Sequence, residues 1–399
     1  MKICFLSQEF PPETRRGGIG TYTYTISKEL AKNHEVHVIT ETSGKERDYK
    51  ENNVYIHKIK PKILRIPFFN IFFGDLIHKL CYNRQVYKKF NSLNINFNAI
   101  QASEWGFEAL FLALNKKNNI ITRLATPTAI VEKINYNKVS LQNKLINILE
   151  KIQAKKSKVI IAPTSFIGKK ISKEWKIPFK RMILMPNPAP EIKKSNKKVP
   201  YKNFILFFGR LEKKKGVLVL LKALENVFKL YPNLKMIFIG KDCINFKNKV
   251  NKTLFKDNII LLPSLEQKHL FDIVSKARFV ILPSLFENFA FSCLESMKLG
   301  KVVIATRNNG FEEIIQDNVS GFLVEPDNPK KLQEKILECL EKKDLDQIEK
   351  NAKKRANEFE TKIIIKQLEK VYKNACLKQA KKFDTRVFIE KIKKEIKNA

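Results

Sequence analysis

Short apolar runs alternate with amphipathic segments along most of this chain. Runs of four to six apolar residues bounded by polar or turn residues predict buried strands. Between them, apolar side chains recur every three or four positions, which predicts helices that cover a sheet. In the first half, the predicted strands are 2–7, 35–40, 99–102, 120–124 and 159–162, and the predicted helices are 21–32, 106–115 and 140–156.

The alternation stops at residues 185–200, which read MPNPAPEIKKSNKKVP, and then begins again. Proline, lysine and asparagine at this density favour neither a helix nor a strand, so we interpret the segment as a linker. Beyond it, the predicted strands are 204–208, 235–240, 259–262, 279–282 and 302–305, and the predicted helices are 216–230, 267–277 and 291–299. This order predicts an α/β protein with two Rossmann-like domains.

Length and composition agree with such an organisation. A chain of 399 residues is long enough for two domains, each with its own core. No run of eighteen apolar residues occurs, and the N-terminus leads directly into a predicted strand, so we expect a cytoplasmic protein. The six cysteines include no CxxC pair, which argues against a structural zinc site and favours free buried thiols.

The net charge of +36 raises the question of a nucleic-acid partner. Lysines occur throughout the chain, and no zinc finger, aromatic RNP-like strand or repeat accompanies them. We therefore expect no nucleic-acid partner. A basic surface also attracts anionic lipid headgroups, which bears on the segment 61–90 below.

Two glutamates stand out in the segment PSLFENFAFSCLESMKLG at 283–300. Glu287 follows a predicted strand, and Glu295 lies near the start of the next helix, where parallel sheets bind their ligands. Glycosidases need carboxyl groups about 5 to 9.5 Å apart. On one helix these two would be separated by ~12 Å of rise, so we interpret them as holding different parts of one ligand.

Two further motifs follow predicted strands. In GRLEKKKG at 209–216, Arg210 and Lys215 are suited to holding a diphosphate, although a solvated run of lysines is the alternative. Near the N-terminus, Gly17 and Gly18 precede a helix, where backbone can approach a phosphate or sugar. The alternative there is a plain flexible turn.

Together these motifs resemble the retaining, sugar-nucleotide-dependent glycosyltransferases of the GT-B fold, often called glycosyltransferase group 1 and family 4-like. The resemblance rests on the Gly17-Gly18 loop, G-R-L-x-x-x-K-G, P-S-x-x-E-x(7)-E and the segment 300–329. It implies two Rossmann-like domains facing across a cleft. The domains are expected at 1–186 and 201–375, joined by a linker at 187–200, with a final helix at 376–399 that returns to the N-terminal domain.

The resemblance also implies roles for individual residues. Arg210 and Lys215 would hold the diphosphate and Glu287 the hydroxyls of the donor sugar, and these three are the expected catalytic residues. Glu295 would hold the ribose. The remaining expected donor-binding residues are Gly17, Gly18, Asn288, Phe289, Ala290, Phe291 and Leu294. The donor is expected to be a nucleotide-diphosphate sugar, and because the cationic side chains and helix-end N–H groups stabilise the leaving group, we expect neither a metal nor another cofactor.

The sequence departs from the family pattern in the N-terminal domain. Many relatives carry a histidine in a segment like R-L-H-T-P, whereas this chain has Ala125 in ITRLATPT, and its histidines lie in other segments. This departure leaves open a catalytically silent subunit that binds sugar nucleotides or glycans. Glu104 follows the predicted strand 99–102 and either faces the ligand or lies on the surface. We favour the surface.

The acceptor is expected to be a saccharide or a lipid-linked saccharide, as in the synthesis of cell-surface polysaccharide, lipopolysaccharide or glycolipid. Residues 61–90 combine many apolar and aromatic side chains with flanking lysine and arginine. Such a segment either contacts an anionic membrane surface, peripherally at the inner face of the cytoplasmic membrane, or forms a helix packed on its own domain.

Overall fold

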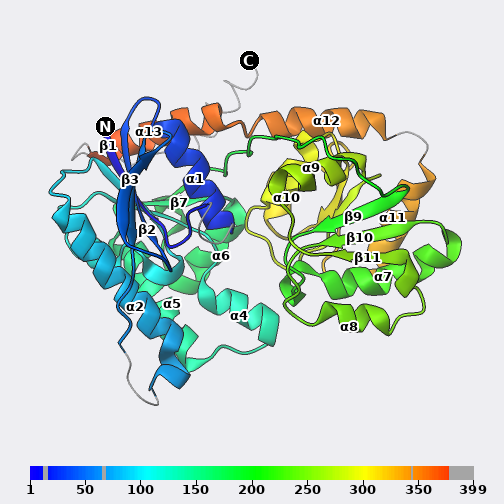
Figure 1. Ribbon diagram of the computed structural model, residues 1–399, viewed down its shortest axis with the longest axis horizontal. Helices are drawn as coiled ribbons and strands as arrows, with labels where there is room; N and C mark the ends of the chain where they lie inside the picture. Colours follow the sequence, from blue (N-terminus) through cyan, green and yellow to red (C-terminus); the bar gives the residue numbers. More distant parts are fainter. Residues whose placement is uncertain (12–16, 65–68, 343–344, 377–399) are drawn as a thin grey trace. The chain divides into compact units, whose positions relative to one another are not determined.

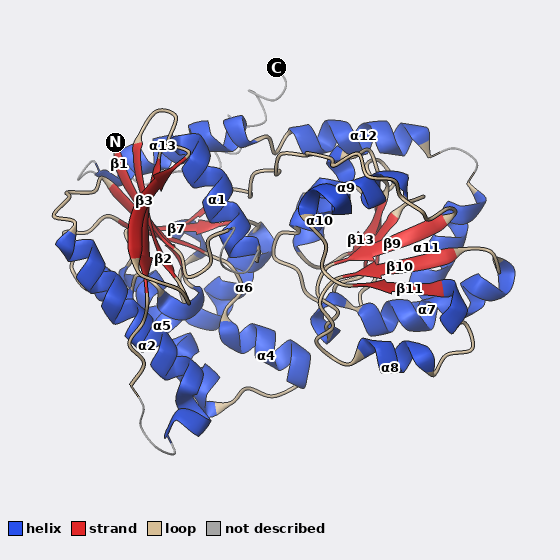
Figure 2. Cartoon of the chain, viewed as in Figure 1, coloured by secondary structure: helices blue, strands red, loops and turns tan. Residues whose placement is uncertain are grey.

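The computed structural model describes residues 1–11, 17–64, 69–342 and 345–376, and it divides the chain into two compact units. Unit 1 comprises residues 1–188 together with the segment that begins at Thr361, and unit 2 comprises residues 189–360. Figures 1 and 2 show a sheet with covering helices in each unit. The α/β class with two parallel-sheet domains is therefore confirmed.

The sheet of unit 1 has eight strands in the order β3-β4-β2-β1-β5-β6-β7-β8, and all its pairs are parallel except β3 with β4. The central residues of β1, β2, β5, β6 and β7 are almost completely buried, as expected of strands covered on both faces, whereas β3 is largely exposed. The strands are β1 (Lys2–Leu6), β2 (Glu35–Glu41), β3 (Arg47–Glu51), β4 (Val54–Ile59), β5 (Ala99–Ser103), β6 (Ile120–Arg123), β7 (Val159–Ala162) and β8 (Met182–Leu184).

The helices of unit 1 include a long one, α2, which occupies most of the segment 61–90, as the alternative of a helix packed on its own domain predicted. Its φ/ψ values depart from helical geometry at Phe73. The α-helices are α1 (Gly18–Leu30), α2 (Phe69–Ser92), α3 (Leu110–Ala113), α4 (Thr128–Tyr136), α5 (Leu141–Lys156), α6 (Ser165–Trp175) and α13 (Thr361–Cys376), and the 3₁₀ turns are η1 (Trp105–Phe107) and η2 (Phe179–Arg181). Among the described helices of the chain, none has the length and apolar character needed to cross a membrane.

Unit 2 has a six-stranded parallel sheet in the order β11-β10-β9-β12-β13-β14. Its strands are β9 (Phe204–Phe208), β10 (Lys235–Ile239), β11 (Ile259–Leu262), β12 (Val280–Leu282), β13 (Val303–Thr306) and β14 (Phe322–Val324). The helices are α7 (Val217–Leu230), α8 (Phe246–Asn251), α9 (Gln267–Lys276), α10 (Phe291–Lys298), α11 (Pro329–Glu341) and α12 (Asp346–Asn357), with 3₁₀ turns η3 (Lys213–Lys215), η4 (Lys256–Asn258) and η5 (Gly310–Glu313). Helix α7 packs with α11, and α10 packs with α12 and α9.

The predicted linker 187–200 belongs partly to unit 2. The backbone N–H of Ala189 donates to the carbonyl of Phe359. Asp272 on α9 accepts hydrogen bonds from the Ser195 hydroxyl and from the backbone N–H groups of Asn196 and Lys197. This proline-rich and lysine-rich segment is thus fixed by side-chain and backbone partners that its local composition does not reveal.

The C-terminal boundary also differs from the prediction, because the chain returns to unit 1 at Thr361 and not after residue 375. Helix α13 buries Ile364, Leu368 and Val371, and it packs on α1 and β5. The hydroxyl of Tyr372 donates to Gln101 Oε1 at 2.7 Å, and Gln101 Nε2 donates to the hydroxyl of Tyr22 on α1 at 2.9 Å. The final helix predicted at 376–399 lies outside the described residues, apart from Cys376.

Smaller differences have local causes. The strands β3 and β4 form a hairpin that was not predicted, in which Asn52 and Asn53 both have positive φ, as a type I′ turn requires. The predicted helix 106–115 is shortened to η1 and α3, because Gly106 and Phe107 have positive φ. All six cysteines are free, but Cys243 is exposed and Cys376 is half-buried.

The packing of α13 predicts a specific loss of stability. Leu368 is fully buried, so Leu368→Ala should lower the free energy of unfolding of unit 1 by about 2–5 kcal/mol. Both tryptophans of the chain, Trp105 and Trp175, belong to unit 1. Tryptophan fluorescence during urea unfolding of the full chain therefore follows this unit alone.

Lys366→Ala is the matched control, because Lys366 lies on the exposed side of the same helix. It should change the free energy of unfolding by no more than about 0.5 kcal/mol. Equal effects of the two substitutions would show that α13 does not contribute its buried face to unit 1.

Candidate functional site

The loops that follow β9 and β12 meet at the carboxyl ends of these two neighbouring strands. The backbone N–H of Leu285 donates to the carbonyl of Lys214 at 2.8 Å. Gly216 has φ +69°, and a Cβ on it would lie 1.8 Å from the carbonyl oxygen of Pro283. Only glycine permits this approach, so the predicted motifs G-R-L-x-x-x-K-G and P-S-x-x-E lie side by side.

Glu287 carries a buried negative charge in this loop pair. Only 8% of the residue is exposed, and its Oε2 lies 2.5 Å from Lys215 Nζ. Burial by itself would raise the pKa of Glu287, but the charges of Lys215 and Lys214 outweigh it and hold the pKa below its ordinary value. The carboxylate therefore stays ionised and remains an acceptor for hydroxyl groups.

Lys214 does not belong to a solvated run of lysines, which was the alternative interpretation of this segment. It is 6% exposed, and burial lowers its pKa to about 8, while the nearby charge of Glu287 acts in the opposite direction. The flanking Lys213 and Lys215 conceal it in the sequence. The signal that was available is its position inside a turn that directly follows a buried strand.

Arg210 lies at the same loop with a more open side chain, 59% exposed, and its Nη2 is 3.1 Å from Glu212 Oε1. Its charge contributes to the low pKa of Glu287, after those of Lys215 and Lys214. Three of the predicted residues, Arg210, Lys215 and Glu287, are thus brought together with Lys214 into one cluster with excess positive charge.

The segment after Glu287 is fixed by a close backbone contact. The N–H of Gly310 donates to the carbonyl of Glu287 at 2.9 Å, and a Cβ on Gly310 would lie 1.7 Å from the carbonyl oxygen of Asn288. Asn288, Phe289 and Ala290 are buried, and Ala290 precedes α10 without a side-chain cap. Gly310 was not predicted, because its role depends on a contact between distant segments.

Glu295 projects from α10 and is 8% exposed. Burial raises the pKa of its carboxyl to about 7. Gln267 Nε2 on α9 donates a hydrogen bond of 3.1 Å to Glu295 Oε1, which acts in the opposite direction and lowers this pKa. Gln267 was not predicted and positions this carboxyl. Phe291 begins the same helix, and Leu294 is fully buried in the hydrophobic core of unit 2.

The remaining predicted residues, Gly17 and Gly18, belong to unit 1. Gly17 is the N-cap of α1, and Gly18 is its first residue. A Cβ on Gly17 would lie 2.2 Å from Glu9 Oε2, so the glycine gives space to this carboxylate. The loop that leads to them, 12–16, lies outside the described residues.

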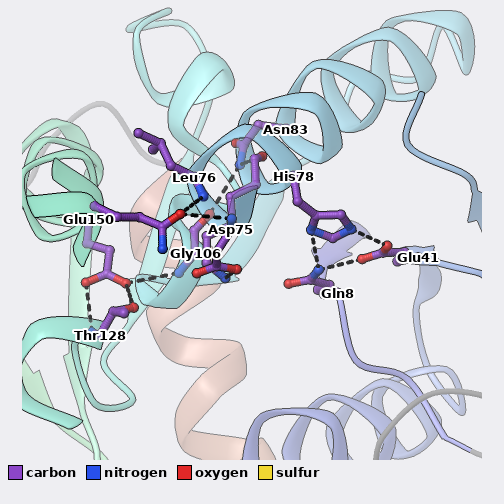
Figure 3. Close-up of polar contacts among 11 residues, drawn as sticks. Gln8, Glu41, Asp75, Leu76, His78, Asn83, Gly106, Thr128 and Glu150 are labelled. Atoms are coloured by element: carbon purple, nitrogen blue, oxygen red, sulfur yellow. Dashed lines mark hydrogen bonds and ion pairs between the residues drawn. The ribbon is translucent and has the colours of Figure 1, made fainter. Parts of the chain in front are cut away.

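Glu104 is completely buried, and the prediction of a surface carboxylate is wrong. Its Oε2 accepts the backbone N–H of Ala125 at 2.6 Å, which fixes the segment where many relatives carry histidine. Burial and the nearby charge of Glu150 raise the pKa of Glu104 to about 8. Glu150 in turn accepts from Gly106 N–H and from the Thr128 hydroxyl, as Figure 3 shows.

The described residues contain no group of three or more histidine, cysteine, aspartate or glutamate side chains that could hold a metal ion. The expectation of a reaction without metal or cofactor stays a prediction.

Comparison with known proteins covers both units. Residues 188–355 match the family model described as Glycosyl transferases group 1, and residues 16–190 match the model described as Glycosyltransferase Family 4. An uncharacterized glycosyltransferase of Methanocaldococcus jannaschii is 27% identical over 395 residues, which cover 93% of this chain and 98% of the relative. An undecaprenol-linked glycan α-1,4-N-acetyl-D-galactosaminyltransferase of Campylobacter jejuni is 25% identical over 90% of this chain and 95% of its own length.

Solved structures share the fold at lower identity. Sucrose-phosphate synthase from Thermosynechococcus elongatus superposes with a TM-score of 0.76 at 16% identity, covering 94% of this chain and 98% of its own. HepE from Anabaena, in complex with UDP and glucose, gives 0.70 at 16% identity, covering 94% and 100%. The predicted GT-B fold is therefore confirmed.

The raised pKa of Glu295 predicts how nucleotide-sugar binding depends on pH. If the ionised carboxylate holds the ribose, binding requires loss of a proton whose pKa is about 7 in the free chain. Affinity should then rise with pH between 6 and 8 and fall by up to about tenfold per pH unit below the pKa. Isothermal titration calorimetry with UDP-glucose and its GDP and ADP counterparts measures this, because their diphosphate diesters do not titrate in this range.

Glu295→Gln is the control, since an amide cannot lose the proton. This variant should bind more weakly at pH 8 and lose the rise in affinity between pH 6 and pH 8. A wild-type affinity that is the same at pH 6 and pH 8 would contradict the ribose-binding role of Glu295.

Proposed function

We propose that this chain, which belongs to the group 1 glycosyltransferases, transfers a sugar from a nucleotide-diphosphate donor and retains the anomeric configuration. The acceptor is a hydroxyl group of a saccharide or a lipid-linked saccharide. One observation carries the proposal: Glu287 is a buried carboxylate held ionised by Lys214 and Lys215 at the carboxyl ends of β9 and β12.

This cluster matches the charges of the proposed reaction. The bond between the anomeric carbon and the diphosphate oxygen breaks, and the leaving diphosphate gains negative charge. Lys215, Lys214 and Arg210 stabilise that charge, because fixed cations in a partly dry site need little reorganisation. Glu287 accepts hydrogen bonds from hydroxyl groups of the donor sugar, and the proton of the acceptor hydroxyl passes to the departing phosphate.

The same cations take the place of a metal ion in this proposal. A divalent cation in related chemistry neutralises the phosphates, and here two lysines and an arginine supply that charge from one loop. The reaction should therefore proceed at full rate in the presence of EDTA.

The ligands and activities of the relatives support this choice of donor and acceptor. The solved HepE structure contains UDP and glucose, and an Escherichia coli trehalose-6-phosphate structure contains UDP-2-fluoroglucose. The Campylobacter relative acts on an undecaprenol-linked glycan. We accordingly place the reaction in the synthesis of cell-surface polysaccharide, lipopolysaccharide or glycolipid.

A second candidate function is a silent subunit that binds sugar nucleotides without transferring the sugar. Ala125 favours it, because a methyl group cannot contact the donor sugar as the histidine of many relatives does. The retained cluster around Glu287 favours the transferase.

Unit 1 also presents an apolar surface that fits a membrane-linked acceptor. Ile71 and Phe72 on α2 are 76% and 71% exposed, and Leu141 and Ile148 on α5 are 62% and 50% exposed. Gln142 joins the two helices, because its Oε1 accepts the backbone N–H groups of Asp75 and Leu76.

Three exposed lysines lie on or shortly before these two helices and suit anionic headgroups: Lys62 before α2, Lys138 before α5 and Lys144 on α5. We therefore propose that this surface contacts the inner face of the cytoplasmic membrane peripherally.

Substitution of Glu287 tests the transferase. Glu287→Gln removes the charge at the donor sugar but not the groups at the ribose, so it should lower transfer by about 100-fold or more. Nucleotide affinity should change little. Release of the nucleoside diphosphate with and without EDTA, together with thermal shifts on nucleotide binding, measures both quantities.

Glu225→Gln is the matched control, because Glu225 is an exposed glutamate on α7 of the same unit. It should leave transfer unchanged. Nucleotide binding by the wild type without turnover of any donor would instead favour the silent subunit.

The apolar surface predicts binding to anionic vesicles. Phe72→Ser should reduce co-sedimentation with vesicles that contain phosphatidylglycerol, because an aromatic ring that inserts among the lipids contributes a large part of the apolar contact. Leu254→Ser is the control, since Leu254 in unit 2 is 98% exposed and lies outside this surface. Equal binding of both variants would refute the membrane contact.

A further inference from the structure

A polar cluster lies at the carboxyl ends of β1 and β2 in unit 1 and includes none of the predicted donor-binding residues. Gln8 follows β1, Glu41 ends β2, and His78 comes from α2. Gln8 Nε2 donates to Glu41 Oε2 at 2.5 Å, and His78 Nε2 lies 2.8 Å from Glu41 Oε1. Figure 3 shows the three side chains pointing toward one another. In parallel sheets this edge is where ligands bind.

Two buried polar atoms next to this cluster lack hydrogen-bond partners among the described residues. Glu108 accepts the backbone N–H of Gln8 with Oε1 at 2.6 Å, but its Oε2 has no partner. The hydroxyl of Tyr82 has none either. Both residues are 1% exposed. Unpaired buried groups are costly, so two of them in one place indicate that a further polar group completes the network.

The unpartnered hydroxyl and the cluster belong to the same neighbourhood. Tyr82 lies one helical turn after His78 on α2, and its pKa is raised by burial and further by Glu108 and Glu41. The outer part of the cluster is open, because the side chains of Glu41 and His78 are 19% and 25% exposed. A ligand can therefore reach Glu41 and His78 from solvent.

The chemistry of the cluster selects for hydroxyl groups over anions. Glu41 carries a negative charge that disfavours phosphate or carboxylate, in a chain whose net charge is +36. Burial raises the pKa of Glu108 to about 8, so this carboxyl is mostly protonated at pH 7 and can donate as well as accept a hydrogen bond. Carboxylates accept hydrogen bonds, and an amide and an imidazole both donate and accept them, which matches the mixed capacity of sugar hydroxyls.

We propose that Gln8, Glu41 and His78 form a subsite for a neutral, hydroxyl-rich saccharide unit of the acceptor, with Glu108 and Tyr82 as further partners. The inference rests on the proposed function and deepens it, because it names the acceptor class: an unphosphorylated sugar at this subsite. Glu41 is its central hydrogen-bond acceptor, and Gln8 and His78 hold the Glu41 carboxylate in position.

Direct binding of simple glycosides to the full chain, without donor, tests the subsite. The probes are the octyl glycosides of glucose, galactose, N-acetylglucosamine and N-acetylgalactosamine, with glucose 6-phosphate as the anionic comparison, measured by saturation-transfer NMR titration. We expect the wild type to bind at least one octyl glycoside, and Glu41→Gln to weaken that binding by about tenfold, as loss of a hydrogen bond to a charged group predicts.

Glu35→Gln is the matched control, because Glu35 and Glu41 are the first and last residues of the same strand and so lie at its opposite ends. It should bind the glycoside as the wild type does. Gln8→Ala provides a second variant with an intact Glu41, in case Glu41→Gln does not fold, and it should also weaken binding.

Equal affinities of the Glu41 and Glu35 variants would overturn the proposal. So would tighter binding of glucose 6-phosphate than of the neutral glycosides, or binding of no glycoside by the wild type. Donor turnover by the wild type tests the transferase separately. The wild type could bind glycosides in a way that depends on Glu41 and yet turn over no donor. That result would support the subsite and refute the transferase.

Discussion

The site of unit 2 depends on one constraint: the carboxylate of Glu287 must stay ionised although it is almost completely buried. Removing an ion from water costs several kcal/mol, and Glu287 stays ionised only because Lys215 touches it and Lys214 lies close by. That arrangement requires the loops after β9 and β12 to meet, which glycine at 216 permits, and the backbone after Glu287 to pack on Gly310. Sheet order, turn geometry and charge are therefore parts of one requirement.

The two units place their polar side chains by the same rule. In unit 1, β1 lies between β2 and β5, and in unit 2, β9 lies between β10 and β12. Both clusters lie at the carboxyl ends of neighbouring parallel strands, β1 and β2 in unit 1 and β9 and β12 in unit 2, where open α/β sheets bind their ligands. The two clusters differ in charge, since lysines dominate around Glu287, whereas an amide and an imidazole contact Glu41. Such a contrast suits one ligand that carries phosphates and another that carries hydroxyl groups.

Local patterns predicted much of this fold, because buried parallel strands are short apolar runs and most helices carry an apolar face. Glu287 and Lys215 were found because each follows such a strand within a family motif. Contacts between distant segments were missed. The burial of Lys214, the approach of Gly310 to Asn288 and the convergence of His78 on Glu41 all depend on tertiary packing. The return of α13 to unit 1 depends on Gln101 and Asn98, which lie 271 and 278 residues from their partners on α13.

Helix α13 has a consequence for the order of folding during synthesis. Residues 189–360 are contiguous, so unit 2 has all its residues once Glu360 has left the ribosome. Unit 1 emerges first but still lacks the helix that covers Tyr22 and Gln101. Domains generally fold as units during translation. The N-terminal sheet must therefore wait, with an apolar face uncovered, until the chain between Thr361 and Cys376 has been made.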